Sequence, residues 1–249
     1  MKKILLISNS FGVDATRYLY GIARKGGENV SVACLFIGGC PLSRHYRNMI
    51  SEEKAYQLYF NGSSTPFRVS LADALLADDW DIVTFQQASP LSGDYSSYIP
   101  YLPELSDYVK ELAPNAKQYI HAIWAWSDAR INKGEREVAY SSSADMFAAD
   151  KIAYKKAALE INADGFIPAT EAMEKLYLAI GDATYRDGAH ASNGVGRYML
   201  GLVWYMTIFG KDIEGINYRD FDVAVSDEEI AIAEKIAREV VAENDYKKQ

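Results

Sequence analysis

Residues Ile4–Gly12 read ILLISNSFG, and this stretch decides how the chain folds. Four apolar residues stand in an unbroken run, which is typical of a short strand buried on both faces. Two lysines precede the run, but the apolar core of a secretory signal needs roughly 7–15 residues. Polar Ser8, Asn9 and Ser10 follow at once. The segment is therefore predicted to be the first strand of a sheet, followed by a turn.

The rest of the chain alternates short apolar runs with helical patterns. Further strands are expected at residues 30–37, 81–85, 118–124 and 165–167, and helices at 14–25, 51–60, 70–76, 146–162, 168–180 and 194–209. Ser70 and Ser226 are expected to cap helices, because each has an acidic residue three positions later. Strands that alternate with helices indicate βαβ units and a parallel sheet. Residues 1–249 are expected to form a single α/β domain.

Composition narrows the function classes. The formal net charge of −8 argues against a general nucleic-acid binder and gives no support for binding to anionic membranes. The two cysteines, Cys34 and Cys40, are too few for a disulfide framework and are expected to be buried thiols. We expect a cytoplasmic protein, and a secreted form whose leader has been removed stays open.

Polar residues follow several of the predicted strands. Ser8–Gly12 follows the first, Gly38–Cys40 the second and Gln86–Ser89 the third, while a late loop carries Asp187–His190. In open parallel sheets, ligands bind outside the carboxyl ends of the strands. These loops are therefore expected to meet at one edge of the sheet.

Together the loops contain the groups that acyl transfer needs. A serine hydroxyl is a weak nucleophile until an adjacent base takes its proton, and His190 could do this for Ser10. Asp187, three residues before His190, could hold the other ring nitrogen and fix the tautomer. We therefore predict that Ser10, His190 and Asp187 act together as a catalytic triad.

An oxyanion hole would complete such a site. The Ser10 backbone amide is expected at a helix N-terminus, where N–H groups are unpaired. Gly38 or Gly39 would let the backbone approach a substrate closely. Gln86 could donate a side-chain N–H, as could Gln87 with less support, because Gln86 directly follows the apolar strand. Structural roles for the glycines and the glutamines stay open.

At these residues the chain resembles the SGNH hydrolases, also called GDSL-like esterases. The first block of that family corresponds to Ile7–Phe11, the second to Gly38-Gly39 and the last to the Asp-x-x-His of Asp187 and His190. The nearest branch is known only as a domain of unknown function, and it is similar to carbohydrate esterases in having Gln in the third block. The resemblance implies a three-layer flavodoxin-like sandwich with a central parallel sheet of about five strands, ester hydrolysis, and neither metal nor other cofactor.

The third block departs from the family pattern. Where the family usually has Gly-x-Asn-Asp, residues 85–89 read Phe-Gln-Gln-Ala-Ser, which leaves the substrate class more open than the reaction. Asn9, Gln87, His121 and Trp124 are the candidates for substrate contact. For His121, a position in the core is favoured over substrate contact. Trp124 could either pack in the core or form an aromatic wall of the site with Trp126.

We therefore expect a serine esterase that removes a small acyl group, most simply acetyl, from a carbohydrate. A lipid esterase or thioesterase with the same triad is one alternative. A carbohydrate-binding protein that keeps the scaffold without catalysis is another. His45 is expected on the solvated surface, beside Arg44 and Arg47. The role of residues 125–145 and the oligomeric state stay open.

Overall fold

A seven-stranded sheet organises the computed structural model, which describes residues 1–134, 139–244 and 246. The strand order is β4-β3-β2-β1-β5-β6-β7. Five neighbouring strands are parallel: β2 (Val30–Phe36), β1 (Lys2–Ser8), β5 (Ile82–Phe85), β6 (Lys117–His121) and β7 (Gly165–Ile167). The predicted parallel sheet of about five strands is confirmed, and two antiparallel strands extend it.

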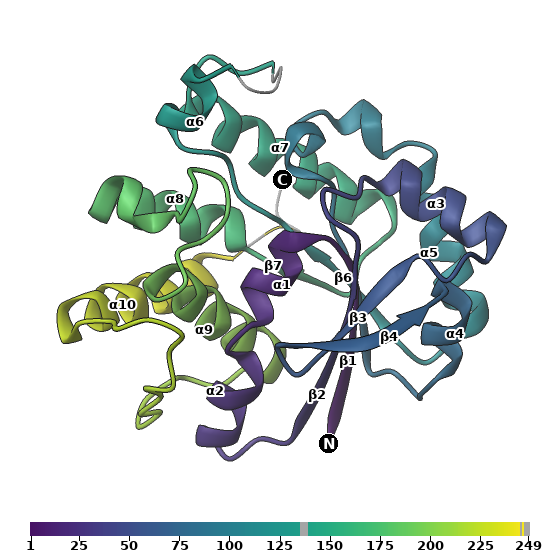
Figure 1. Ribbon diagram of the computed structural model, residues 1–249, viewed down its shortest axis with the longest axis horizontal. Helices are drawn as coiled ribbons and strands as arrows, with labels where there is room; N and C mark the ends of the chain where they lie inside the picture. The colour runs from purple at the N-terminus through teal and green to yellow at the C-terminus, as the bar shows by residue number, and fades with distance from the viewer. Residues whose placement is uncertain (135–138, 245, 247–249) are drawn as a thin grey trace.

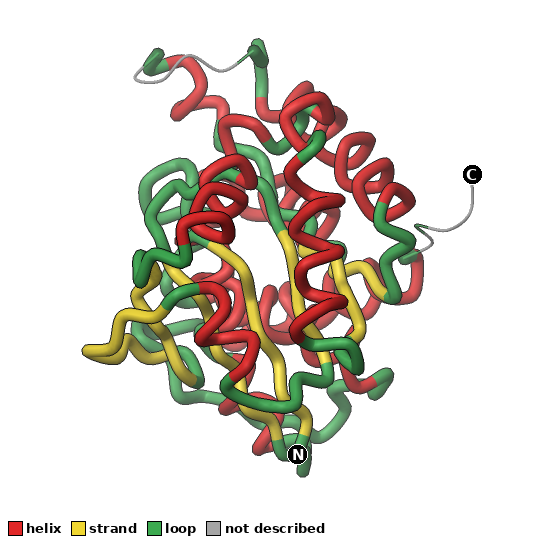
Figure 2. The backbone as a smooth tube through the Cα atoms, turned by 90° about the vertical axis from the view of Figure 1, so that its right-hand side faces the viewer, coloured by secondary structure: helices red, strands yellow, loops and turns green. Residues whose placement is uncertain are grey.

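Helices cover both faces of the sheet, which gives three layers (Figures 1 and 2). One group consists of α1 (Ser10–Thr16), α2 (Leu19–Lys25), α8 (Ala169–Ile180), α9 (Val195–Phe209) and α10 (Asp227–Glu243), on the left in Figure 1. The opposite group includes α3 (Leu42–Ser51), α4 (Leu71–Leu76), α5 (Tyr101–Leu112) and α7 (Ser143–Glu160). A short helix, α6 (Asp128–Asn132), follows β6. The α/β fold expected from the sequence is confirmed.

The antiparallel extension corrects one prediction. The helix expected at residues 51–60 is wrong, because α3 ends at Ser51 and β3 (Tyr56–Phe60) forms a hairpin with β4 (Ser63–Val69). The turn between them is Asn61-Gly62, and both residues have positive φ, 48° and 80°. Asn-Gly is the dipeptide that tight hairpin turns favour, since both of its residues adopt positive φ at little cost. This local signal outweighs the apolar spacing that suggested a helix.

The helix expected at residues 14–25 divides into α1 and α2. The hydroxyl of Thr16 donates to the carbonyl oxygen of Gly12 at 2.8 Å, a bond that competes with the backbone ladder and bends helices. Gly12 itself lies against β1, where a Cβ atom would come within 1.9 Å of the Ser8 hydroxyl. Only a glycine allows α1 to pack this closely on the end of β1, and Ser10 is thereby held at the edge of the sheet.

Both predicted helix caps are confirmed. Ser70 and Asp73 form a capping box at the start of α4, and Ser226 and Glu229 form another at α10. Both cysteines are buried free thiols, as expected. In the described part of the chain, no helix combines the length and apolar character needed to cross a membrane.

Candidate active site

Ser10 begins α1 directly beyond the carboxyl end of β1. Asn9 caps this helix, because its side-chain oxygen accepts the N–H of Phe11 at 3.1 Å. The same oxygen accepts the Gln86 side-chain N–H at 2.8 Å, which holds Asn9 against the end of β5. Ser10 is thus the first residue of a capped helix, with its side chain half-buried and its backbone N–H outside the helical ladder.

A continuous chain of hydrogen bonds joins Ser10, His190 and Asp187. His190 Nε2 lies 2.8 Å from Ser10 Oγ, and His190 Nδ1 lies 2.6 Å from Asp187 Oδ2. The other carboxylate oxygen of Asp187 accepts the backbone N–H of His190 at 2.8 Å and that of Ala189 at 3.0 Å. The three residues predicted to act together are therefore brought together, across 180 residues of sequence.

The surroundings of Asp187 keep its carboxylate ionised. Partial burial acts to raise the pKa of Asp187, but the hydrogen bonds from the His190 backbone and ring and from the Ala189 backbone outweigh it and lower the pKa to about 2. Protonation of this carboxyl is therefore expected only as the pH falls towards 2. An ionised acceptor at His190 Nδ1 favours the tautomer in which Nε2 can accept a proton from Ser10.

The loop that carries Asp187 and His190 is fixed at both ends. The Arg186 backbone N–H donates to the His190 carbonyl oxygen at 3.0 Å, and Tyr185 pairs with Ala191 as a β-bridge. Gly188 has a φ of 80°, and a Cβ atom there would lie 2.8 Å from the Arg130 side chain. A glycine is therefore required at 188 by both its backbone angle and the close approach of α6.

Ser10 and His190 open into a pocket of about 350 Å³. Its lining comes from loops that follow parallel strands, from the segment around α6 and from the turn that carries His190. The residues are Asn9, Ser10, Phe11, Gly38, Gly39, Ser89, Pro90, Trp126, Arg130, Ala189 and His190. The expected meeting of these loops at the carboxyl edge of the sheet is confirmed.

Three residues that line the pocket have backbone N–H groups that are unpaired among the described residues. Within the described part of the chain, the amides of Ser10, Gly38 and Gly39 have no acceptor in the protein. Gly39 has a φ of 59°, in the region that favours glycine. The backbone amides expected to form an oxyanion hole are therefore unpaired at the carboxyl edge of the sheet.

Gln86 does not reach the pocket, which corrects its predicted place there. Its side-chain N–H is taken by Asn9, and its oxygen accepts from Ser8 at 3.0 Å and faces His121 Nδ1 at 2.8 Å. Gln87 is also buried, and its amide bonds Ser97 and the backbone of α3. Because both side chains are buried and hydrogen-bonded inside the protein, they hold the loops together and do not line the pocket.

The predicted substrate contacts of His121 and Trp124 are corrected for the same reason. Both are fully buried, and neither lines the pocket. Trp124 donates its indole N–H to the Ala189 carbonyl oxygen at 2.9 Å and packs on Phe11 with ring centroids 4.6 Å apart. Trp124 therefore supports the loop of His190 from beneath. The core position favoured for His121 is confirmed.

His45 is fully buried, so its expected place on the surface is wrong. Its Nδ1 lies 2.9 Å from the Tyr56 hydroxyl, and the two rings stack between α3 and β3. The sequence suggested a surface position because Arg44 and Arg47 flank His45. In the structure both arginines are exposed, while His45 lies on the buried side of the same helix. The polar cluster was only one face of an amphipathic helix.

The two buried histidines predict an acid-sensitive fold. Burial lowers the pKa of both His45 and His121 to about 3, well below the value of about 6.5 expected in the unfolded chain. Between about pH 3 and 6.5, the histidines of the unfolded chain bind protons that those of the folded chain do not bind. The free energy of unfolding therefore decreases as the pH falls. Each histidine contributes a slope of about 1.4 kcal/mol per pH unit. His121→Gln is expected to reduce the slope of unfolding free energy between pH 4 and 6 by that amount, measured by denaturant titration.

A further buried group, Asp150, also makes the stability of the fold depend on pH. It is a buried carboxyl whose pKa burial raises well above its usual value, so its contribution to stability falls as the pH rises and opposes that of the histidines. The comparison is therefore between His121→Gln and the wild-type protein, both of which keep Asp150. An unchanged slope in the variant would show that His121 takes up its proton in the folded state.

Two pocket residues carried no recognised signal in the sequence. Arg130, on α6, lies with its guanidinium 5.7 Å from the centre of the Trp126 ring, and Trp126 in turn donates to the Ser89 hydroxyl at 3.0 Å. Pro90 lines the pocket beside Ser89. Among the described residues, no group of three His, Cys, Asp or Glu side chains is placed to hold a metal ion.

Comparison with solved structures identifies near and distant relatives. A DUF4886 family protein from Bacteroides uniformis ATCC 8492 is 28% identical, with a TM-score of 0.87 over 97% of this chain and 95% of that one. A candidate SGNH hydrolase from Slackia heliotrinireducens is 21% identical, with a TM-score of 0.58 over 83% of this chain and 98% of that one. The lipase/acylhydrolase from Enterococcus faecalis is 17% identical, with a TM-score of 0.54 over 84% of this chain and 96% of that one.

The distant relatives show that this chain shares its fold with these hydrolases, as the resemblance to the SGNH hydrolases implied. No curated protein matches the chain in sequence. The model of one protein family, described as a domain of unknown function (DUF4886), matches residues 3–240. That match covers nearly the whole chain, and the protein therefore belongs to the DUF4886 family.

Proposed function

We propose that this protein is a serine ester hydrolase. The observation that carries the proposal is the unbroken chain of hydrogen bonds from Asp187 through His190 to Ser10, which ends in a pocket beside unpaired backbone amides. A weak nucleophile, a base within hydrogen-bond reach and a third group that orients the base are the parts of covalent acyl transfer. The similarity of fold to a lipase/acylhydrolase supports the same reaction class.

The proposed reaction has two steps. Ser10 Oγ attacks the ester carbonyl carbon while His190 Nε2 takes its proton, and the amides of Ser10, Gly38 and Gly39 bind the developing oxyanion. The tetrahedral intermediate then expels the alcohol, which receives the proton from His190. Water, activated by His190 in turn, attacks the acyl-enzyme and releases the acid and the free Ser10 hydroxyl. Asp187 holds the imidazole ring throughout and stabilises its charged form.

The pocket favours a short acyl group. Its apolar lining is limited to Phe11, Pro90, Trp126 and Ala189, and its volume of about 350 Å³ is at the low end for small-molecule sites. Trp126 is buried beneath the Arg130 guanidinium, and the polar Arg130 side chain at the pocket suits a substrate rich in hydroxyl groups, such as a sugar. We therefore propose acetyl, carried on a carbohydrate, as the substrate. A panel of acetyl, butyryl and longer esters tests the acyl part, and faster turnover of the longer chains would favour a lipid esterase or thioesterase.

Labelling with a fluorophosphonate tests the reaction without knowledge of the substrate. The probe should modify Ser10 in the folded protein, and peptide mass spectrometry should find it there. His190→Ala should lose the label, because the serine then has no base. Ser89→Ala is the matched control, since Ser89 also lines the pocket and has no such base, and it should keep the label. A folded wild-type protein that stays unlabelled, or carries the label elsewhere, contradicts the proposal and favours a carbohydrate-binding role.

A further inference from the structure

Asp14 is a buried charge that the reaction described above does not use. It lies on α1 four residues after Ser10, about one turn away on the same helix, and its side chain is 1% exposed. It does not line the pocket. A buried carboxylate is retained in a fold only when other groups compensate its charge, so its partners indicate its role.

Two arginines from distant parts of the chain bind Asp14. Arg186 Nη1 donates to both carboxylate oxygens, at 2.9 and 2.8 Å. Arg197, on α9, donates to Oδ1 from Nε at 3.0 Å and from Nη2 at 2.8 Å. Arg197 also bonds Asp222 at 2.8 Å, so it anchors α1 to α9 and to the loop between α9 and α10. The two arginines therefore tie the same carboxylate to two different structures.

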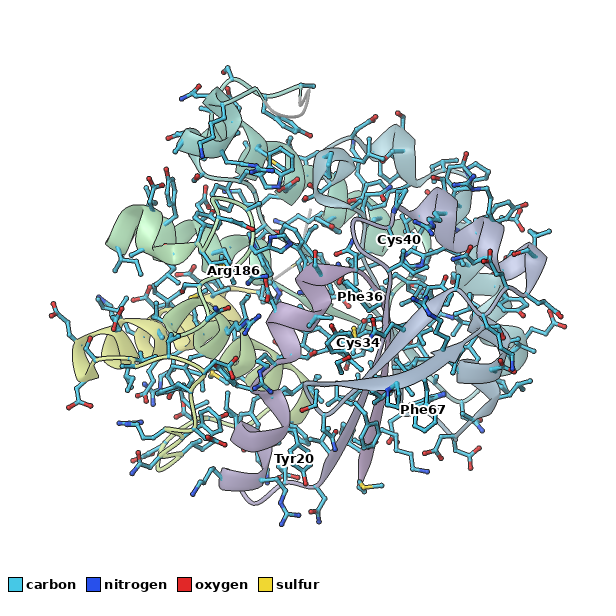
Figure 3. The ribbon with its side chains drawn as sticks, in the orientation of Figure 1. Tyr20, Cys34, Phe36, Cys40, Phe67 and Arg186 are labelled. Atoms are coloured by element: carbon cyan, nitrogen blue, oxygen red, sulfur yellow. The ribbon has the colours of Figure 1, made fainter. Side chains whose placement is uncertain are left out.

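Arg186 is the residue directly before Asp187, and it is bonded to the loop of His190 at several points. Its Nη1 donates to the Ala191 carbonyl oxygen at 2.7 Å, and its backbone N–H donates to the His190 carbonyl oxygen. Figure 3 shows Arg186 beside helix α1. A single side chain thus joins the helix that begins with Ser10 to both ends of the turn that carries His190.

We propose that the Asp14–Arg186 ion pair is a positioning device that sets the distance between Ser10 Oγ and His190 Nε2. The proposal rests on the proposed function. Ser10 and His190 belong to segments that are 180 residues apart in sequence, and their own contact is one hydrogen bond of 2.8 Å. Loss of the brace removes the direct ion pair between α1 and the 186–191 turn and leaves the aromatic contacts of α1 to hold them, so the two can shift relative to each other. A displacement of about 1 Å in a reacting pair can cost about 100-fold in rate.

Arg186→Gln and Arg197→Gln provide the matched comparison. Each removes one of the two arginines from the same carboxylate, so the charge on Asp14 loses similar compensation in both. Only Arg186→Gln removes the ion pair that joins α1 to the turn of His190. The rate of fluorophosphonate labelling is measured at a series of probe concentrations, which separates the maximal labelling rate from probe affinity, and thermal unfolding is followed in the same samples.

Arg186→Gln is expected to lower the maximal labelling rate of Ser10 by about 10- to 100-fold with little change in probe affinity. Arg197→Gln, with a comparable loss of thermal stability, should stay within about threefold of the wild type. Arg186→Lys keeps the charge but lacks the planar guanidinium that directs Nη1 at both acceptors, so it should recover part of the rate. It replaces Arg186→Gln if that variant does not fold. Equal rate losses in the 186 and 197 variants, or none in the 186 variants, would overturn the brace. An unlabelled wild-type protein would instead remove the proposed function, and the brace with it.

Discussion

Replacement of Ser10 by alanine is expected to lower ester turnover by about 10⁶-fold, the scale of loss seen when the nucleophile of a serine hydrolase is removed. Among the residues that the structure describes, the hydroxyl bonds only His190 Nε2, so the fold should not depend on it. His190→Ala should cost about as much. Because the two residues act as a unit, the double variant should be no slower than either single variant.

The measurement is kcat on an acetyl ester for the two single variants and the double variant, with a thermal unfolding curve for each. Additive losses in the double variant would show that Ser10 and His190 do not share one step. A Ser10→Ala protein with more than a few per cent of the wild-type rate would mean that another group carries the reaction.

Asp187→Asn is expected to lower kcat by about 10²- to 10⁴-fold while the loop stays in place. The asparagine oxygen can still accept the backbone N–H groups of Ala189 and His190, which bond Oδ1 in the wild type. The side-chain NH₂ then faces His190 Nδ1. It favours the tautomer with the proton on Nε2, and that nitrogen can no longer accept the proton of Ser10.

Asp182→Asn is the matched control for this variant. Asp182 is an exposed carboxylate five residues earlier, outside the pocket that holds Ser10, and its replacement should leave kcat within about twofold. The two variants change the net charge equally, so the comparison isolates the bond to His190. If both variants lowered kcat alike, the effect of Asp187 would be one of overall charge and not of tautomer.

Local patterns predicted much of the fold. The apolar run at Ile4–Ile7 and the capping boxes at Ser70 and Ser226 form as expected, because each depends on residues within one turn or one strand. The hairpin was missed although Asn61-Gly62 is a strong turn signal, because the apolar spacing around it also fits a helix. The turn signal and the tertiary pairing of β3 with β2 together favour the strand over the helix.

Residue type and order were enough to predict that Ser10, Asp187 and His190 come together. Gln86 shows the limit of that reasoning. Its place after β5 was predicted, but the direction of its amide depends on Asn9, Ser8 and His121, which come from two other parts of the chain. The pairing of Asp14 with Arg186 spans 172 residues, and no periodicity in the sequence connects such positions.

The hairpin has a further consequence for how copies of this protein behave at high concentration. It makes β4 the outer strand on one side of the sheet, and an exposed backbone edge can recruit another chain. Pro66 interrupts the row of donors on β4, and Arg68 adds charge next to Phe67, whose ring is largely exposed (Figure 3). At the opposite side, β7 has three residues, and Asn244 donates to its Phe166 carbonyl oxygen at 2.9 Å. Within the described part of the chain, both borders of the sheet are therefore interrupted, which disfavours fibre-like stacking of the folded protein.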